Sequence, residues 1–365
     1  MENKKKFKVA IVVGTRPELI KFSPIIKELE FHKIKFFIIH TGQHYSYFLD
    51  SIFYKDLKLP KPKYNLGVGS VSALSQIAVA ILKLERVFKK EKPNLVLVEG
   101  DTNSVLAGAL AAVKSSISVG HVEAGLRCGN FEMHEEQNRI LTDHCSSFLF
   151  APTKISRSNL IAEGINKRKI ILTGNTIVDA VYAFNAVIRN KREIFEKSGL
   201  EKQKYFLATI HRAESTDYKK RLSLIINVLN ELSGLLPVIF PIHPRTKKFL
   251  KLYKLKLDKN IRLLGPVGYI NFLSLLKNSF LVLTDSGGVQ EEACILKIPA
   301  VTIRNETERP ETTAVGANTV TGYSKERILA AVHKMSRSSR EWRNPFGRGN
   351  AGKKIVGFIK EYYEV

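Results

Sequence analysis

Short runs of hydrophobic residues alternate along the chain with longer stretches in which apolar positions recur every three or four residues. The short runs are four or five residues long and bounded by turn-forming residues, a pattern typical of buried parallel strands. In the first half of the chain they predict strands at 9–13, 36–39, 95–98, 118–122 and 148–151. The stretches between them predict helices, including 17–30 and 102–114.

The second half repeats this alternation. Strands are predicted at 205–209, 238–242, 261–264, 281–284 and 299–303, and helices at 221–232, 272–277 and 325–334. Strands that alternate with helices form a parallel sheet covered by helices on both faces. Two such series predict an α/β protein in which two Rossmann-like domains face a cleft.

We place the domain boundary after residue 174. Residues 1–174 then form the N-terminal domain, and 175–351 form the C-terminal domain, with a long helix at 176–196 leading from one to the other. By analogy with folds of this shape, the last helix, within 352–365, is expected to pack back on the N-terminal domain.

Composition narrows the class of protein. The chain has 365 residues, of which 44% are hydrophobic and 25% charged, which is ordinary for a globular protein and excludes a disordered chain or a collagen. No apolar run approaches the roughly 18 residues of a membrane span, and 9–13 is too short for a signal-peptide core. We therefore expect a cytoplasmic protein. The three cysteines show no metal-binding or disulfide spacing and are expected to be incidental thiols.

The net charge of +24 is the unusual feature of the composition. Such a charge indicates nucleic acid, an acidic membrane surface or an anionic small substrate as partner. The basic residues are scattered in short clusters, and aromatic residues do not interleave with them as they do on a base-stacking surface. We expect solvated lysine faces that attract anionic ligands, with nucleic-acid binding as the rival hypothesis.

Polar residues follow the first predicted strand. Gly14 permits a tight turn, Arg16 suits phosphate recognition at a helix N-terminus, and Lys21 lies one turn further along. A simple turn with surface charges is the alternative.

Three acidic residues follow later strands or open a helix in the same domain: Asp101, Glu123 and Glu135. Asp101 follows 95–98, where it or Thr102 could instead cap the next helix. Glu123 lies two residues after His121, so both side chains can point the same way from the strand end. Carboxylates gathered at one edge of a sheet supply acid and base groups near neutral pH.

The second domain carries residues suited to an anionic ligand. His211 ends the strand at 205–209 and is a candidate acid, base or phosphate ligand. Ser286, Gly287 and Gly288 join a strand to a helix, where exposed amides and the helix dipole attract phosphate. Glu292, one turn further, is placed to bind ribose hydroxyls. The dinucleotide pattern GxGxxG is absent, so no nicotinamide cofactor is indicated.

Taken together, the motifs resemble those of the non-hydrolysing UDP-N-acetylglucosamine 2-epimerases, which have the two-domain GT-B fold. The matching segments, in order, are 14–18, 100–102, 121–127, 135–139, 174–176, 285–292 and 307–311. This resemblance implies reversible epimerisation at C2 of UDP-GlcNAc to UDP-ManNAc. UDP is eliminated to give 2-acetamidoglucal and is then added back, with no metal or redox cofactor. It also implies a homodimer.

The resemblance assigns roles to individual residues. It makes Asp101, Glu123 and Glu135 the acid/base carboxylates, supported by Lys21. It makes His211 the group that stabilises or protonates UDP as it leaves. The nucleotide contacts would be Arg16, Ser286, Gly287, Gly288 and Arg309 for the diphosphate, Phe272 for uracil and Glu292 for ribose. A second, activating UDP-GlcNAc would bind near Gln43, His44, Arg212 and His243.

Three positions depart from the family pattern, and alternatives stay open. Ala213 replaces an arginine, His134 a proline and Val267 a glutamine. The enzymatic rivals are a 2-epimerase of a UDP-2,3-diacetamido uronic acid sugar, a variant that hydrolyses UDP to release free ManNAc, and a GT-B glycosyltransferase.

Overall fold

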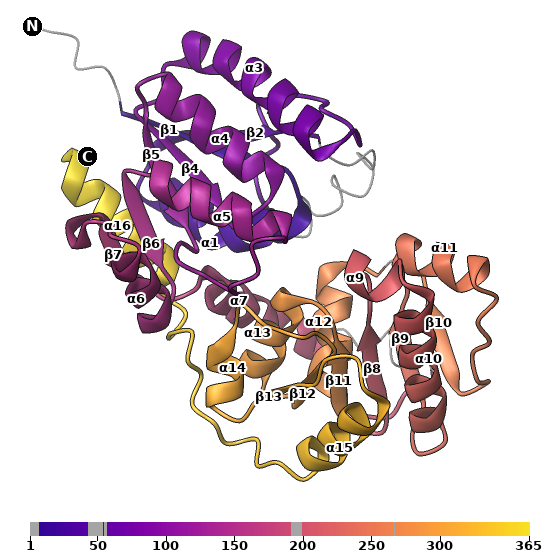
Figure 1. The fold of residues 1–365 in the computed structure, drawn as a ribbon. Coiled ribbons are helices and arrows are strands. Elements are labelled where there is room, and N and C mark those ends of the chain that lie inside the picture. The colour runs from indigo at the N-terminus through magenta and orange to yellow at the C-terminus, as the bar shows by residue number, and fades with distance from the viewer. Residues whose placement is uncertain (1–6, 43–53, 55–56, 191–198, 266) are drawn as a thin grey trace, which may run out of the picture. The chain divides into compact units, whose positions relative to one another are not determined.

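The computed structural model describes residues 7–42, 54, 57–190, 199–265 and 267–365, and its chain divides into two units (Figure 1). Unit 1 comprises Met1–Ala180 and Phe346–Val365, and unit 2 comprises Val181–Pro345. The division falls later than the expected boundary after residue 174. The reason is that Asp179 accepts hydrogen bonds from the amides of Ala351 and Gly352, at 3.1 and 3.0 Å, which ties this part of the chain to unit 1.

Unit 1 is built on a seven-stranded parallel sheet in the order β3-β2-β1-β4-β5-β6-β7. The strands are β1 (Lys8–Val13), β2 (Lys35–His40), β3 (Tyr64–Asn65), β4 (Leu95–Glu99), β5 (Ser118–Val122), β6 (Phe148–Ala151) and β7 (Ile170–Leu172). Val9 on the central strand β1 pairs in register with Phe36 on β2 and with Leu95 on β4. The central strands are fully buried, which explains their unbroken apolar runs.

Helices cover both faces of this sheet (Figure 1). They are α1 (Arg16–Phe31), α3 (Ala73–Glu91), α4 (Asn103–Lys114), α5 (His134–Cys145), α6 (Lys154–Ala162), the start of α7 (Thr176–Asn190) and α16 (Ala351–Tyr363), with a 3₁₀ turn at Lys167–Lys169. The last helix, α16, packs on α1. A Cβ on Gly352 would lie 2.9 Å from Pro24, so glycine allows this close crossing.

Unit 2 contains a six-stranded parallel sheet in the order β10-β9-β8-β11-β12-β13. The strands are β8 (Phe206–Thr209), β9 (Val238–Pro241), β10 (Ile261–Leu264), β11 (Leu281–Thr284), β12 (Ala300–Thr302) and β13 (Asn318–Val320). One hydrophobic cluster joins the sheet to α10 (Lys219–Ser233) and α15 (Lys325–Ser336). A second joins it to α12 (Tyr269–Asn278) and α13 (Gly287–Leu296). The shorter helices are α9 (Ala213–Thr216), α11 (Pro244–Leu252) and α14 (Pro310–Ala314).

The predicted strands are all present, and the differences lie at the edges. Strands β3, β7 and β13 were not predicted, because a strand of two or three residues at a sheet edge is too short to give a clear apolar run. The helix predicted at 176–196 is seen as far as Asn190, and 191–198 lie outside the described residues. Within the described part of the chain, no helix has both the length and the apolar character needed to cross a bilayer.

Candidate active site

Both sheets reverse their strand order at a central pair, which is β1 and β4 in unit 1 and β8 and β11 in unit 2. In open α/β sheets, ligands bind outside the carboxyl ends of the strands at this reversal. The polar residues singled out in the sequence follow these strands or their neighbours. Each unit therefore has its own candidate site.

In unit 1, a buried glutamate fixes the turn from β1 into α1. Glu18 accepts hydrogen bonds from the Gly14 amide at 2.6 Å and from the Thr102 hydroxyl at 2.8 Å, and so joins this turn to the loop after β4. A Cβ on Gly14 would lie 2.0 Å from Ser104 Oγ, so only glycine fits. Burial raises the pKa of Glu18 to about 7, although its hydrogen bonds oppose the shift. Half-buried Arg16 is the first residue of the helix.

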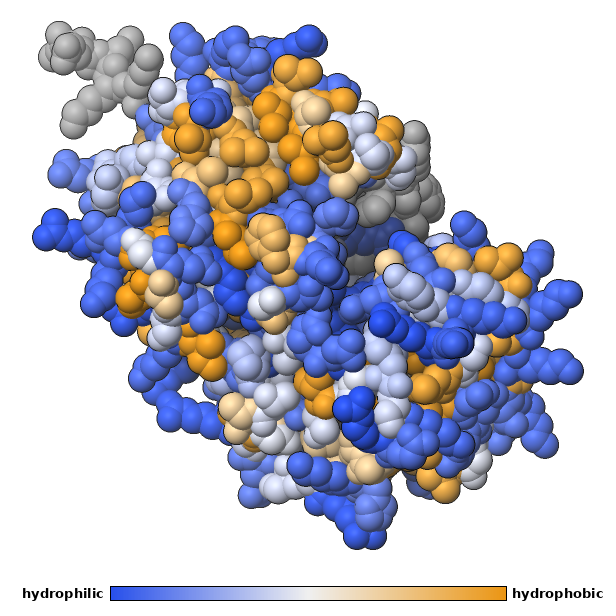
Figure 2. All heavy atoms as spheres, viewed as in Figure 1, coloured by the Kyte–Doolittle hydropathy of each residue, from blue (hydrophilic) through white to orange (hydrophobic). Residues whose placement is uncertain are grey.

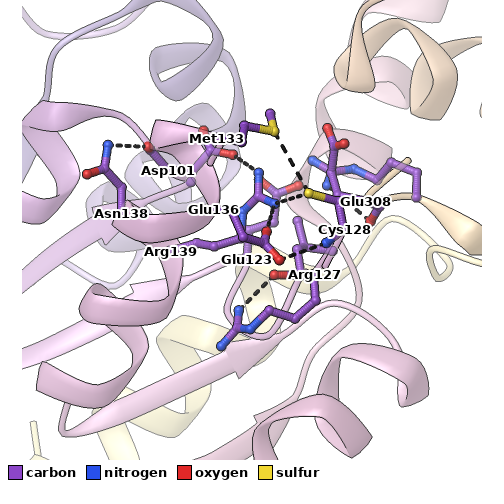
Figure 3. Close-up of polar contacts among 12 residues, drawn as sticks. Asp101, Glu123, Arg127, Cys128, Met133, Glu136, Asn138, Arg139 and Glu308 are labelled. Carbon is purple, nitrogen blue, oxygen red and sulfur yellow. Dashed lines mark hydrogen bonds and ion pairs between the residues drawn. The ribbon is translucent and has the colours of Figure 1, made fainter. Parts of the chain in front are cut away.

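Asp101 lies in the loop after β4 and pairs with a buried arginine on α5. Asp101 Oδ2 is 2.6 Å from Arg139 Nη2, and the aspartate side chain is 30% exposed (Figure 3). Asn138 Nδ2 also donates to the Asp101 carbonyl at 3.0 Å. The cap of α4 is the neighbouring Thr102, whose hydroxyl accepts from the Val105 amide. Asp101 is thus held in place by α5 rather than used as a helix cap.

Glu123 follows β5 and forms a buried ion pair. Its Oε2 accepts from Lys21 Nζ of α1, and its Oε1 accepts from Asn175 Nδ2 at 3.2 Å. Glu123 is 5% exposed, and its φ of +70° lies in the left-handed region. Non-glycine residues in this region occur at functional sites more often than elsewhere. The predicted association of Lys21 with a carboxylate is therefore seen in the structure.

His121 and Glu123, which could point the same way from the end of β5, bind different partners. His121 Nδ1 lies 2.6 Å from Asp143 Oδ1, and its Nε2 lies 2.8 Å from the Gly100 carbonyl. The left-handed backbone at Glu123 breaks the strand alternation. Burial acts to raise the pKa of Asp143, but His121 and Arg127 hold it below its usual value. His121 belongs to this buried network and not to the Lys21 pair.

The two adjacent glutamates that open α5 have different surroundings. Glu136 is buried, accepts from the amides of Cys128 and Gly129 at 3.0 and 2.9 Å, and pairs with Arg139 (Figure 3). It therefore fixes the loop before α5. Glu135 is half-buried, and its side chain makes no hydrogen bond or ion pair with another described residue. Of the two, Glu135 is the one available to a ligand.

Sequence reasoning missed two charged residues of this site. Glu99, the last residue of β4, is 1% exposed, and its Oε1 lies 3.2 Å from Lys21 Nζ, so the lysine faces two carboxyl groups. The sequence contained a signal for Glu99, because a charged residue directly follows the apolar run 95–98. Arg139, which joins Asp101 to Glu136, stood within a quoted motif but was given no role.

In unit 2, a buried aspartate holds the histidine that follows β8. Asp285 follows the adjacent strand β11 and accepts from the amide of His211 at 2.9 and 3.1 Å and from the amide of Arg212 at 2.9 Å. His211 Nδ1 lies 3.4 Å from Asp285 Oδ1, and the histidine side chain is 40% exposed. The histidine is thus anchored next to the start of α13 while much of its ring remains accessible.

Helix α13 begins without a side-chain cap. Ser286 occupies the N-cap position but makes no capping hydrogen bond through its side chain. A Cβ on Gly287 would lie 2.2 Å from Glu308 Oε1, whereas a Cβ on Gly288 would meet no described atom within 4 Å. The first glycine is therefore required by packing, and the second borders open space. Uncapped amides at such a helix start are suited to an anion.

Buried ion pairs surround this helix start. Arg309, predicted to contact a diphosphate, is 4% exposed, and its Nε lies 2.6 Å from Glu291 Oε1. Glu308 lies 2.7 Å from Arg304 Nη1 and 3.5 Å from Arg212 Nη2. The carboxylates of Glu291 and Glu308 thus hold three arginines in fixed positions.

The residues predicted for the nucleoside lie on α12 and α13. Phe272 is partly buried and packs on the cluster between the sheet and these helices. Glu292 is 6% exposed. Burial, together with the nearby carboxylate of Glu292, raises the pKa of Tyr269 well above its usual value. The structure therefore groups Tyr269 and Glu292.

Only part of the predicted activator site falls within the described residues, because Gln43 and His44 lie outside them. His243 caps α11 through Nδ1, which accepts from the Arg245 amide at 3.2 Å. Its ring centroid is 5.6 Å from that of His211. Arg212 follows His211 directly in the chain. His211, Arg212 and His243, all implied by the resemblance, therefore lie in the loops after β8 and β9.

Neither a metal centre nor a disulfide is found among the described residues. No group of three His, Cys, Asp or Glu side chains there is arranged to hold a metal ion. The cysteines Cys128, Cys145 and Cys294 are free thiols. Burial raises the pKa of Cys294 to about 12.

Two Rossmann-like units, one with carboxylates and one with a glycine-rich helix start, define a two-domain α/β enzyme of the GT-B fold class. The family model described as UDP-N-acetylglucosamine 2-epimerase matches residues 27–360. The UDP-N-acetylglucosamine 2-epimerase of Methanocaldococcus jannaschii is 52% identical over 96% of this chain and 98% of its own. The chain therefore belongs to the UDP-N-acetylglucosamine 2-epimerase family.

Two further comparisons describe its neighbours. A crystal structure of the M. jannaschii UDP-GlcNAc 2-epimerase in complex with UDP-GlcNAc and UDP superposes with a TM-score of 0.93, at 50% identity, over 97% of this chain and all of that one. The UDP-2,3-diacetamido-2,3-dideoxy-D-glucuronate 2-epimerase of Pseudomonas aeruginosa is 39% identical over 96% of this chain and 99% of its own.

Proposed function

We propose that this enzyme interconverts UDP-GlcNAc and UDP-ManNAc without hydrolysing them. The C2 proton is removed as UDP leaves, which gives 2-acetamidoglucal and UDP. A proton then returns to the other face of C2 and UDP adds back at C1. The observation that carries this proposal is the buried pair of Glu123 and Lys21 at the end of β5, within a site that also contains Asp101.

The carboxylates of unit 1 are assigned the proton transfers. A hydrogen on C2 is only weakly acidic, so its removal needs a base held in a fixed position. Glu123 is fixed by Lys21 and Asn175, and Asp101 is fixed by Arg139. Glu135 opens α5 on the same edge of the sheet and completes the set of three.

The residues of unit 2 are assigned to UDP. The amides of Gly287 and Gly288, together with Ser286, would bind the diphosphate, and the positive end of the α13 dipole would favour its charge. His211, held by Asp285, would stabilise or protonate UDP as it leaves. Phe272 would stack on uracil, Glu292 would bind ribose, and Arg16 and Arg309 would add diphosphate contacts.

The decisive experiment is NMR of UDP-GlcNAc with the enzyme in D2O. Abstraction and return of the C2 proton exchange it with solvent, so deuterium should appear at C2 of both UDP-sugars during turnover. A product that keeps its C2 hydrogen would contradict the mechanism. Free UDP and free ManNAc in equal amounts would instead identify a hydrolysing enzyme.

The main alternative substrate is a UDP-2,3-diacetamido uronic acid sugar, as in the name of the P. aeruginosa relative. That relative is 39% identical to this chain, whereas the M. jannaschii relative is 52% identical, and we favour UDP-GlcNAc for this reason. A comparison of kcat/KM for the two sugars decides between them. A higher value for the uronic acid sugar would replace the proposed substrate.

We also propose that the enzyme is a homodimer, and we assign the contact to an apolar face of unit 1. Figure 2 shows apolar side chains gathered over α3, α4 and α5. The exposed large apolar residues on or next to these helices are Val71, Leu74, Leu82, Val113 and Leu141. Residues 71–82 and 103–113 contain no charged side chain, although the chain carries a charge of +24. A two-fold symmetric contact brings the same surface patch of both subunits together, so an uncharged face avoids repulsion between like charges.

The oligomeric state tests this assignment. Light scattering should give about twice the monomer mass for the unaltered enzyme and the monomer mass for a Leu74→Glu, Leu82→Glu variant. Leu235→Glu is the matched control, because Leu235 is 74% exposed in unit 2 and lies outside the face. A monomeric parent enzyme, or a Leu74→Glu, Leu82→Glu variant that stays dimeric, would contradict the proposal.

A further inference from the structure

Three buried carboxyl groups and one lysine lie at the switch point of unit 1. Lys21 Nζ contacts Glu123 Oε2 and lies 3.2 Å from Glu99 Oε1. Glu18, one turn before Lys21 on α1, is 2% exposed. Glu99 and Glu123 are 1% and 5% exposed. If all three carboxyl groups were ionised, one lysine would have to balance three negative charges away from water, and this is unfavourable.

The two carboxyl groups that face Lys21, those of Glu99 and Glu123, have different surroundings. Glu123 receives hydrogen bonds from both Lys21 and Asn175, and these favour its ionised form. Oε1 of Glu99 accepts no hydrogen bond within the described part of the chain. Burial raises the pKa of Glu99 well above 4.5. The charge of Lys21 opposes this shift, whereas the charge of Glu123 and a hydrogen bond between Glu99 and Glu123 increase it.

We propose that Glu99 is a positioning residue for Glu123: its protonated carboxyl group donates a hydrogen bond to the Glu123 carboxylate, so that the two groups share one negative charge, which Lys21 balances. The arrangement fixes Glu123 from a third side, after Lys21 and Asn175. Its effect on catalysis rests on the proposed role of Glu123 as a base. The charged or titratable groups that face Glu99 are Lys21 and Glu18 from α1 and Glu123 from the end of β5.

Infrared spectroscopy tests the protonation of Glu99 without any assay of activity. Protonated carboxyl groups absorb apart from carboxylates, and Glu18, with a pKa of about 7, contributes its own signal. Glu18→Gln removes that signal. At about pH 7 the Glu18→Gln enzyme should keep a protonated-carboxyl band, and this band should disappear when Glu99→Gln is added.

The control for the spectra is Glu91→Gln in the same unit. Lys63, Tyr64 and Lys8 lower the pKa of Glu91 to about 2, so this residue is ionised near neutral pH and its replacement should leave the band unchanged. A band that survives Glu99→Gln would overturn the proposal. The Glu18→Gln enzyme provides a second test that does not require the double variant to fold. If its spectrum lacks the protonated-carboxyl band, the proposal is also overturned.

The pH dependence of kcat/KM tests the consequence for catalysis. Once Glu99 loses its proton, Lys21 faces two negative charges, so the parent enzyme should lose activity at alkaline pH. Glu99→Ala should lower kcat about tenfold with little change in KM. Glu99→Gln keeps a neutral donor, so it should lose less kcat than Glu99→Ala and should lack the alkaline decline.

These outcomes separate the two proposals. A role in packing alone would lower stability in both Glu99 variants without removing the alkaline decline, and that result would overturn the positioning role. A parent enzyme that shows no epimerase activity would overturn the proposed function, while the infrared result would still decide whether Glu99 holds the proton.

Discussion

The switch points of the two units have the same strand order but opposite chemistry. In unit 1, the residues after β1, β4 and β5 include Glu18, Asp101 and Glu123, with Glu99 closing β4. In unit 2, the residues after β8 and β11 include His211, a glycine pair and buried arginines nearby. The proposed function assigns proton transfer to the first set and anion binding to the second. The fold thus supplies the location, and the side chains at the strand ends decide the chemistry.

The largest expected effect concerns the carboxylates of unit 1 and tests their assignment to proton transfer. Asp101→Asn, Glu123→Gln and Glu135→Gln should each lower kcat by roughly 10²–10⁴, because acid and base groups act in the transition state. UDP affinity, measured by calorimetry, should change little, since none of these three carboxylates is assigned a contact with UDP.

Glu85→Gln is the matched control for these variants. Glu85 pairs with Lys89 at 2.6 Å on the surface of α3, away from the strand ends, and its replacement should leave kcat unchanged. Near-normal kcat in all three carboxylate variants would show that these groups are structural.

The second effect concerns the pH dependence of stability that buried Glu18 of unit 1 should cause. The pKa of Glu18 is about 7 in the folded state, against an ordinary 4.5, so the folded chain keeps a proton between these values that the unfolded chain has lost. Stability is therefore lost as the pH rises through this window, by up to about 3 kcal/mol.

Urea unfolding at several pH values measures this loss. Glu18→Gln cannot ionise, so the difference in stability between the parent and this variant should change across the window and level off above about pH 7. A difference that does not depend on pH would show that Glu18 titrates normally.

The smallest of the three effects tests the anion site of unit 2. Gly288→Val places a branched side chain in the open space beside the start of α13, where a diphosphate would lie. UDP binding should weaken about 10²-fold in calorimetry, which corresponds to about 2.7 kcal/mol.

Gly357→Val provides the control for this variant. Gly357 is also a helical glycine whose added Cβ would meet no atom within 4 Å, and it lies on α16 in unit 1. Both variants should keep a native circular dichroism spectrum, and only Gly288→Val should lose affinity. Unchanged UDP affinity in a folded Gly288→Val variant would place the nucleotide elsewhere.

The sequence by itself determined the elements and the location of the chemistry. Buried parallel strands require continuous apolar runs, so 148–151 and 281–284 were predicted with the bounds that the structure shows. The polar residues at the ends of such runs then had to gather at one edge of each sheet. The family motifs gave the same positions and a reaction to assign to them.

The tertiary structure alone decided which charged groups meet. Lys21 and Glu123 are 102 residues apart in the chain, and nothing in the local pattern shows that the lysine also reaches Glu99. The left-handed backbone of Glu123 overrode the alternation expected from its strand. The reason is physical: local apolar periodicity determines strands and helices, whereas the pairing of buried charges depends on which elements pack together, and that is settled only when the whole sheet forms.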